Sequence, residues 1–170
     1  MNRRIVLLVW LLAFLTATCA HTRSEDHWDE YQRRTLKSII ESQGDLKGLD
    51  KIKGVDRKKN AMYFPGTFPS QAELVYLDGF RPMSPKHVSL LAAWRTSVGG
   101  YAPPADAFTT EAQFREGSEE YWISVQQPLL DGFRKDVRRG DVIEAYVVLI
   151  GAIRVGRRWE WLFAMNRFDS

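Results

Sequence analysis

Two adjacent glutamates, Glu119 and Glu120, stand directly before the aromatic pair Tyr121 and Trp122. Burial against an aromatic wall raises the proton affinity of a carboxyl group, which suits general acid catalysis. Paired carboxylates beside aromatic side chains are also typical of glycosidases, which hold and cleave a sugar. An acidic stretch before a strand is also common as a solvated surface. The pair therefore makes a hydrolase the alternative function, with Glu119 and Glu120 as its candidate catalytic residues.

A second group combines basic and aromatic side chains near the C-terminus: Arg154, Arg157, Arg158, Trp159 and Trp161. Gly156 separates the arginines and predicts a turn that brings them together. Grouped guanidinium groups bind phosphate or carboxylate bidentately, and the tryptophans offer apolar surface beside them. Charge at the end of a hairpin also keeps it soluble and prevents edge pairing. We expect these residues to form the binding site if the ligand is anionic.

Nucleophilic and metal chemistry find little support elsewhere. The histidines are His21, His27 and His87, which lie far apart, and Cys19 is the one cysteine. A nucleophile needs a base beside it, and a transition-metal site needs ligands at close spacing. His87 lies on the apolar side of a predicted helix, where packing or hydrogen bonding at the helix start explains it. The sequence predicts no cofactor and no metal.

The N-terminus has the three parts of a secretory signal peptide. Arg3 and Arg4 form a basic start, an uninterrupted apolar run covers residues 5–15, and small residues follow up to Ala20. The run is too short to span a membrane, which takes about 20 residues. We expect cleavage after Ala20 and a periplasmic or secreted mature protein. Two alternatives stay open, namely acylation of Cys19, which would anchor a lipoprotein, and an uncleaved signal.

The charge of the mature chain argues against nucleic acid as a partner. The full chain has 24 Lys plus Arg and 21 Asp plus Glu. Loss of Arg3 and Arg4 with the signal leaves 22 basic and 21 acidic residues, a net charge of +1. Nucleic-acid-binding domains carry a marked basic excess. The predicted partners are an anionic component of the cell envelope or another envelope protein. Membrane contact is expected only if Cys19 is acylated or the signal is uncleaved.

The first part of the mature chain predicts one helix and one linker. Trp28, Tyr31 and Ile39 recur at helical spacing, which predicts an amphipathic helix over residues 24–43. Residues 44–60 carry few apolar side chains and an excess of lysine, which predicts a solvated linker.

Turn and cap signals set the remaining boundaries. Asp78-Gly79 and Gly99-Gly100 predict ends of elements, while Ser84-Pro85 and Pro128 predict helix starts. The predicted elements are strands over 61–64 and 72–77, a helix over 85–98, a loop over 101–110, a strand over 120–126, a helix over 128–139 and strands over 142–153 and 159–168.

The last two strands carry the densest apolar sequence and are joined by a tight connection at Gly156. They predict an antiparallel hairpin buried on both faces at the centre of the domain. The predicted fold class is α+β, with an antiparallel sheet and a long C-terminal β-hairpin covered by two to three helices, the first helix packed outside.

The composition fits one ordinary globular domain, because 45% of the residues are hydrophobic and 26% are charged. The predicted organisation is a signal peptide over 1–20, the helix and basic linker over 21–60, and a single α+β domain over 61–170. The predicted function is that of a small exported binding or interaction module without catalysis. The alternatives are a cell-envelope hydrolase that uses the glutamate pair, and a lipid-anchored envelope protein acylated at Cys19.

Overall fold

The computed structural model describes residues 30–43, 55–56, 60–64, 68–99 and 105–170. The predicted signal peptide, Cys19, His21 and His27 lie outside these residues, as does most of the predicted linker. In the described part of the chain, no helix is long and apolar enough to cross a membrane.

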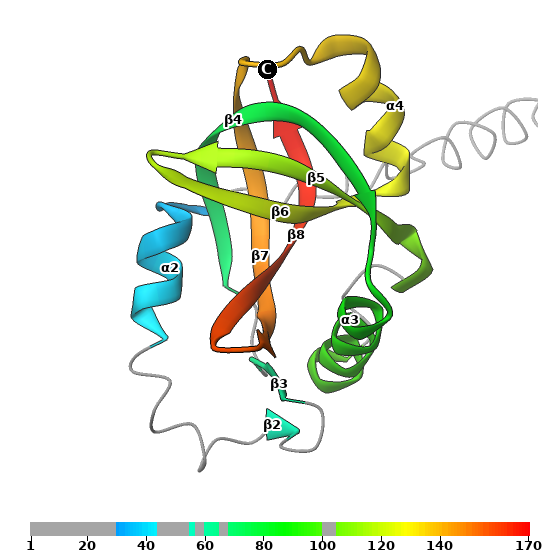
Figure 1. The fold of residues 1–170 in the computed structure, drawn as a ribbon. Helices are drawn as coiled ribbons and strands as arrows, with labels where there is room; N and C mark the ends of the chain where they lie inside the picture. Colours follow the sequence, from blue (N-terminus) through cyan, green and yellow to red (C-terminus); the bar gives the residue numbers. More distant parts are fainter. Residues whose placement is uncertain (1–29, 44–54, 57–59, 65–67, 100–104) are drawn as a thin grey trace, which may run out of the picture.

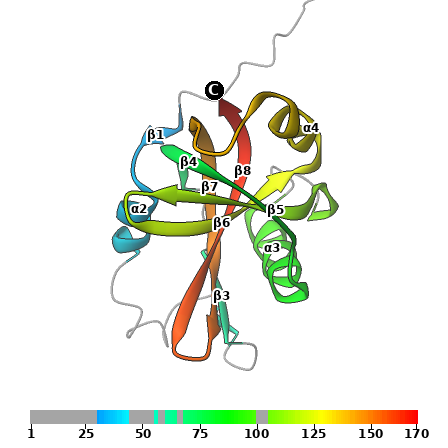
Figure 2. The same cartoon turned by 45° about the horizontal axis from the view of Figure 1, so that its top comes forward.

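Five long strands close into a barrel (Figures 1 and 2). They are β4 (Pro69–Pro82), β5 (Phe108–Glu116), β6 (Glu119–Gln126), β7 (Val142–Val155) and β8 (Arg158–Asp169). Their order around the barrel is β4, β5, β6, β8 and β7, and β7 pairs again with β4. Short strands extend this sheet: β1 (Gln32–Arg33) pairs with β4, β3 (Ala61–Tyr63) pairs with β7, and β2 (Val55–Asp56) pairs with β3.

The predicted α+β class and the long C-terminal hairpin are confirmed, but the sheet is mixed. β7 and β8 form the antiparallel hairpin, with a turn at Gly156. β6 pairs with β8 in parallel, and β1 pairs with β4 in parallel. The prediction of a purely antiparallel sheet is therefore wrong. The reason is the connection through α4 (Gln127–Asp136), which joins β6 to β7. β7 runs opposite to β6, and β8 runs opposite to β7, so β8 is parallel to β6.

The predicted turn at Asp78-Gly79 is a bulge inside one long strand. β4 pairs with β7 over residues 69–75 and with β5 over residues 75–82, with a register shift between Tyr76 and Phe80. Asp78 has a φ of 63°, a conformation that aspartate tolerates better than most residues. The turn signal therefore marks the bend that lets one strand belong to both sides of the barrel.

Three further boundaries differ from the prediction. The helix predicted over 24–43 is α2 (Leu36–Ser42) in the described residues, because the Thr35 hydroxyl caps it by accepting a hydrogen bond from the Ser38 N–H. The loop predicted over 101–110 ends early, since a 3-10 turn (Ala105–Ala107) leads into β5. The helix predicted over 128–139 ends at Asp136. By contrast, α3 (Pro85–Val98) has the predicted bounds, with Ser84 as its N-cap and Gly99 as its C-cap.

Two buried clusters hold these elements together. The main core fills the barrel, where buried side chains of β4 to β8 meet Leu130 and Phe133 of α4. Leu36 and Ile39 of α2 are fully buried in the same core, so the expectation that the first helix packs outside is wrong. The second cluster lies between α3 and the outer face of β7 and β8. α3 thus covers the hairpin from outside, while α2 and α4 cover the barrel elsewhere (Figures 1 and 2).

Candidate functional site

A cavity lies where β6 and β8 stand apart in the barrel wall. Their parallel pairing begins at Ile123 and Phe163. The residues before this point, 119–122 of β6 and 158–161 of β8, line a cavity of about 610 Å³. This volume falls within the range of small-molecule sites, roughly 300 to 1,000 Å³. The other lining residues are Lys37, Ile40 and Glu41 of α2, Arg81 of β4 and His87 of α3.

Strand alternation divides this lining into two walls. On both strands the odd-numbered side chains lie on the side of the barrel interior, like the core residues Ile123 and Phe163 that follow them. The aromatic wall comprises Tyr121, Trp159 and Trp161, which are half-buried and pack against the main core. The even-numbered side chains lie on the outer side, toward α3, like Leu162 in the cluster beneath that helix. The polar wall comprises Glu120, Glu160, Arg81 and His87.

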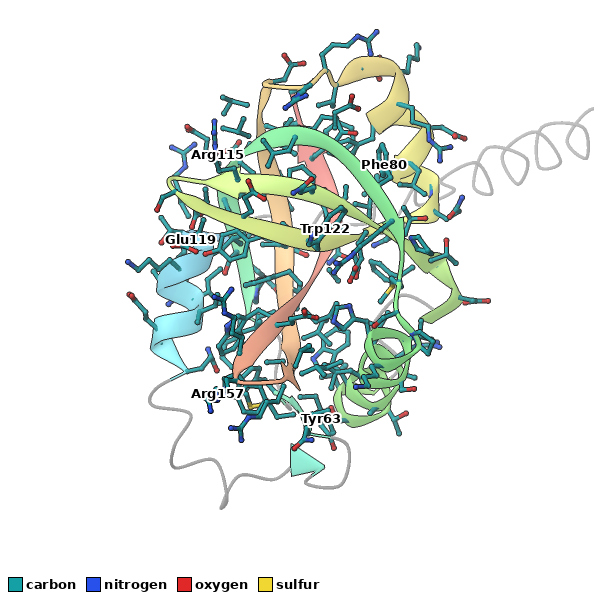
Figure 3. All side chains as sticks on the ribbon, viewed as in Figure 1. Tyr63, Phe80, Arg115, Glu119, Trp122 and Arg157 are labelled. Atoms are coloured by element: carbon teal, nitrogen blue, oxygen red, sulfur yellow. The ribbon has the colours of Figure 1, made fainter. Side chains whose placement is uncertain are left out.

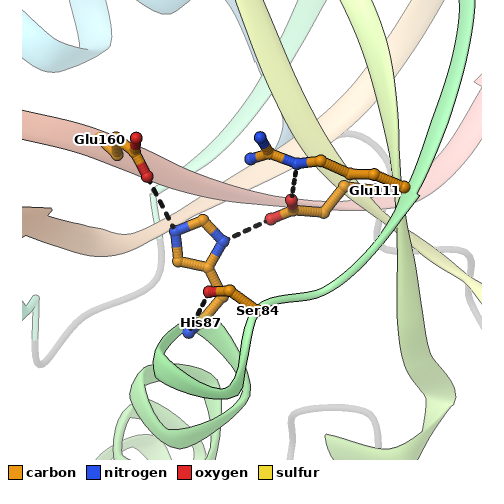
Figure 4. A network of polar contacts seen from close by, with 5 residues as sticks. Ser84, His87, Glu111 and Glu160 are labelled. Atoms are coloured by element: carbon orange, nitrogen blue, oxygen red, sulfur yellow. Dashed lines mark hydrogen bonds and ion pairs between the residues drawn. The ribbon is translucent and has the colours of Figure 1, made fainter. Parts of the chain in front are cut away.

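A buried carboxylate organises the polar wall (Figure 4). Glu111 of β5 is fully buried, and its two oxygens contact two different partners. Oε1 lies 2.6 Å from His87 Nδ1, and Oε2 accepts a hydrogen bond of 2.6 Å from Arg81 Nε. Charge-assisted hydrogen bonds of this length are among the strong ones in proteins. Glu111 therefore fixes both the imidazole and the guanidinium at the cavity.

Local sequence explains how these three side chains meet. Arg81 and Glu111 are direct cross-strand partners on β4 and β5, so their side chains share one face of the sheet. The Ser84 hydroxyl caps α3 by accepting a hydrogen bond from the His87 N–H, which places His87 in the first helical turn. His87 is almost fully buried, and its Nε2 lies 3.9 Å from Oε2 of Glu160 at the cavity. Nε2 is thus the edge of the imidazole available to a ligand.

Arg81 also covers the ring of Trp122. The guanidinium carbon lies 4.3 Å from the ring centroid, a cation–π geometry. Gly79 makes room for the ring, because a Cβ at this position would lie 3.2 Å from a Trp122 ring carbon and 2.6 Å from the Gln113 side-chain oxygen. The bulge in β4 thus lets Trp122 lie close against the strand, and the arginine is held by a carboxylate and by a ring.

The aromatic wall has a perturbed tyrosine. Burial, and then the nearby charges of Glu116, Glu119 and Glu41, raise the pKa of Tyr121 to about 12. Tyr76 in the main core shows a similar change, because burial and the neighbouring Asp78 raise its pKa to about 12. Both phenols are therefore neutral hydrogen-bonding groups at physiological pH.

These two tyrosines predict a loss of stability at high pH. An unfolded tyrosine ionises near pH 10, whereas Tyr76 and Tyr121 hold their protons to about pH 12 in the folded protein. Their stabilising contribution is complete below pH 10 and is lost as the pH rises from 10 to 12. Denaturant melts over this interval should show a falling free energy of unfolding, and Tyr121→Phe should make the fall shallower. An identical slope in the variant would contradict the assignment of this effect to Tyr121.

The structure brings together most of the residues proposed from sequence. Glu119 and Glu120 both line the cavity, but they lie on opposite faces of β6, and Glu120 accepts a hydrogen bond of 2.9 Å from Gln113. Of the second group, Arg158, Trp159 and Trp161 line the cavity. Arg154 and Arg157 are exposed and are not among the lining residues; Figure 3 shows Arg157 at the turn between β7 and β8 and Glu119 near α2.

Sequence reasoning missed Arg81 and Glu111, and it explained His87 by packing or by hydrogen bonding at the helix start. The three residues are 6 to 30 positions apart, and no motif connects them. One signal existed in β5, where Glu111, Gln113 and Arg115 alternate with the apolar Ala112 and Phe114. This pattern is typical of a strand with one outward face, and it would have placed Glu111 on that face.

Comparison with known proteins identifies no family for this chain. A scan against models of protein families gives no match, and a search of curated proteins gives none either. Among the described residues no group of three or more His, Cys, Asp or Glu side chains is arranged to hold a metal ion. The function must therefore be argued from the cavity itself.

Proposed function

We propose that this domain binds a carbohydrate chain in the cavity between β6 and β8. The observation that supports this proposal is that aromatic and polar side chains line one cavity of about 610 Å³. A sugar ring has apolar faces and a polar rim of hydroxyl groups. Its face can stack on Trp159 or Trp161, while its hydroxyl groups hydrogen-bond to Glu160, Arg81 or His87 on the other side.

The barrel topology supports the same proposal. A five-stranded Greek-key barrel with a helix between its third and fourth strands resembles the OB-fold, and here β4 to β8 supply the five strands and α4 the helix. OB-folds bind oligonucleotides and oligosaccharides on the face of strands two and three, between the loops that join strands one to two and four to five. The cavity lies beside β6, the third strand, between α3, which connects the first two strands, and Arg158 next to the β7–β8 turn, while no residue of β5, the second strand, lines it. This likeness is one of topology, so the ligand class depends on the lining.

Charge favours a sugar over an oligonucleotide. The lining includes the carboxylates Glu41, Glu119, Glu120 and Glu160, against the cations Lys37, Arg81 and Arg158. The buried carboxylate of Glu111 already neutralises Arg81. Single-stranded nucleic acid is bound in grooves with a clear positive excess. This lining instead suits a neutral, hydroxyl-rich chain.

The N-terminal sequence is consistent with a role outside the cytoplasm. If residues 1–20 direct export, the mature domain meets cell-envelope polysaccharides, whether it is free or anchored at Cys19. The anionic ligand considered for the arginine group would use Arg158 in the cavity together with Arg154 and Arg157 on the exposed turn. We propose the neutral chain because it uses both walls.

Calorimetric titration with chitotetraose, a neutral tetramer of N-acetylglucosamine, tests the proposal. We expect saturable binding, and Glu160→Gln or Trp159→Ala should weaken the Kd by roughly tenfold or more, the loss typical of a central contact. Asp136→Asn is the matched control, because Asp136 is exposed on α4 and does not line the cavity. A circular-dichroism melt of each variant reports whether it is folded.

Three results would overturn the proposal. One is the absence of binding to both chitotetraose and cellotetraose. Another is binding that folded cavity variants retain unchanged. The third is a preference for a single-stranded oligonucleotide or for anionic vesicles that depends on Arg154 and Arg157, which would return the site to the exposed turn.

A further inference from the structure

The polar wall contains an arrangement that binding alone does not need. Glu111 holds an imidazole with one oxygen and a guanidinium with the other, each at 2.6 Å. All three groups are anchored on different elements, β5, α3 and β4. The buried carboxylate thereby sets the position of His87 relative to Arg81 before any ligand arrives.

The hydrogen bond to Glu111 sets the orientation of His87. A carboxylate oxygen accepts and does not donate, so Nδ1 of His87 carries the hydrogen in this contact. The other ring nitrogen, Nε2, then has a free lone pair in the neutral imidazole and points to the cavity. A carboxylate that orients a histidine in this way is a recurrent device for general base catalysis.

Glu160 stands opposite this base. Its Oε2 lies 3.9 Å from His87 Nε2, too far for a direct hydrogen bond but close enough for one water molecule to contact both atoms. The Glu160 side chain is half-exposed, so water reaches this point. The pair thus defines a place for a polarised water molecule.

Arg81, whose charge Glu111 balances, supplies hydrogen-bond donors beside this base. Its Nε is used by Glu111, and its guanidinium is held against Trp122. The residue also lines the cavity. A fixed guanidinium beside a base can stabilise negative charge that develops on a carbonyl oxygen.

From this geometry we infer that the cavity hydrolyses a carboxylic ester carried by the bound carbohydrate, such as an O-acetyl group. The inference rests on the proposed sugar binding. Nε2 of His87 takes a proton from water, and the water oxygen bonds to the acyl carbon. The carbonyl electron pair moves to oxygen beside Arg81. The intermediate then expels the sugar oxygen, which takes the proton from Nε2, and a carboxylic acid and a free hydroxyl group leave.

The lining favours ester hydrolysis by water over covalent catalysis, glycosidic cleavage and phosphodiester cleavage. Among the described residues that line the cavity there is no serine, threonine or cysteine, so water is the nucleophile. Glycosidic cleavage needs two carboxyl groups that flank the scissile bond. Glu41, Glu119 and Glu120 also line the cavity, but the group 3.9 Å from Glu160 is the imidazole of His87. The carboxylates of the lining repel a phosphodiester. Hydrolysis of an ester needs only a general base, a water molecule and a group that stabilises the oxyanion.

Acetate release from chemically O-acetylated chitotetraose tests the inference. The wild-type protein should release acetate with saturation kinetics, and His87→Gln should lower kcat by about 100-fold or more, the usual contribution of a general base. The Kd for unmodified chitotetraose should weaken by far less than kcat falls in this variant, since Trp159 and Trp161 remain to hold the sugar. Asp136→Asn should be unchanged. His87→Ala should regain activity with added imidazole, which a purely structural histidine would not do.

Glu111 is a positioning residue in this scheme, and its role has its own readout. Nitrogen-15 NMR of the neutral wild-type imidazole should show a protonated Nδ1 and a bare Nε2. In Glu111→Gln the tautomers should mix and kcat should fall while KM changes little. Wild-type protein with its proton on Nε2 would overturn the inference, even if no His87 variant folds.

The outcomes separate the two proposals. If chitotetraose binds but no acetate is released, the hydrolytic inference fails and the binding function stands. If neither chitotetraose nor its acetylated form binds, both fail. If acetate is released equally fast by His87→Gln, the reaction does not use this site.

Discussion

Replacing Glu111 by alanine is expected to destabilise the protein by about 3 kcal/mol, at the lower end of the 3 to 5 kcal/mol typical for removing one partner from a buried ion pair. The carboxylate is fully buried and holds both His87 and Arg81. Its loss leaves Nδ1 of an almost fully buried imidazole without an acceptor. The lower end applies because the Arg81 side chain is 38% exposed and can turn toward water. A urea melt monitored by circular dichroism measures the change.

Glu111→Gln is the matched control for this prediction. The glutamine has one carbonyl oxygen, which accepts from either His87 Nδ1 or Arg81 Nε, so its NH2 group faces the other partner and the uncharged side chain holds the two less strongly. We expect a loss of about 1 to 2 kcal/mol, between those of the wild type and the alanine variant. Equal stability of all three proteins would show that Glu111 contributes no net stability to the fold.

Sequence patterns predicted α3 and the β7–β8 hairpin, because residues within or next to each element determine its bounds. α3 matches its predicted bounds because Ser84, Pro85 and Gly99 act within one helical turn of its ends. The β7–β8 hairpin follows from two long apolar runs around Gly156, which has a φ of 61° at the turn. Neither feature depends on a distant part of the chain.

The closure of the barrel depends on contacts between residues far apart in sequence. The parallel pairing of Ile123 with Phe163 spans the whole of α4 and β7, and strand alternation does not specify which edge a strand will join. β5 was missed because its outward side chains are polar and its inward ones include the small Ala112. The bulge at Asp78 and Gly79 has the sequence signal of a turn, since the same residue types favour both.

Sequence could predict only the part of the candidate site whose residues are contiguous in the chain. The aromatic and charged residues of β6 and β8 are contiguous, so sequence could mark Glu119, Glu120, Arg158, Trp159 and Trp161. Each segment is the start of a strand, β6 or β8. The two starts lie side by side only because these strands pair further along, from Ile123 and Phe163. The Glu111 network joins three elements through a cross-strand pair and a helix cap, and no spacing in the chain reports such a meeting.

A second large loss of stability is expected for Phe133→Ala. Phe133 of α4 is fully buried, and its ring centroid lies 4.3 Å from that of Phe168, 5.3 Å from that of Tyr76 and 5.7 Å from that of Phe114. These rings join α4 to β4, β5 and β8 in the main core. The truncation removes apolar burial from all of these contacts and leaves a void that fixed strands cannot fill. We expect a loss of about 3 to 5 kcal/mol in a urea melt.

Val88→Ala is the control for this truncation, because Val88 lies on the outer side of α3 with 40% of its surface exposed. Its change should stay within about 0.5 kcal/mol, as for most surface substitutions. Neither Phe133 nor any of the three rings around it lines the cavity. At temperatures well below its melting temperature, Phe133→Ala should therefore bind chitotetraose with the wild-type Kd. A loss under 1 kcal/mol would mean that α4 is not part of the main core. Lost binding in a folded variant would mean that this end of the barrel and the cavity are coupled, so that the stability of the scaffold and the function of the site could not be altered separately.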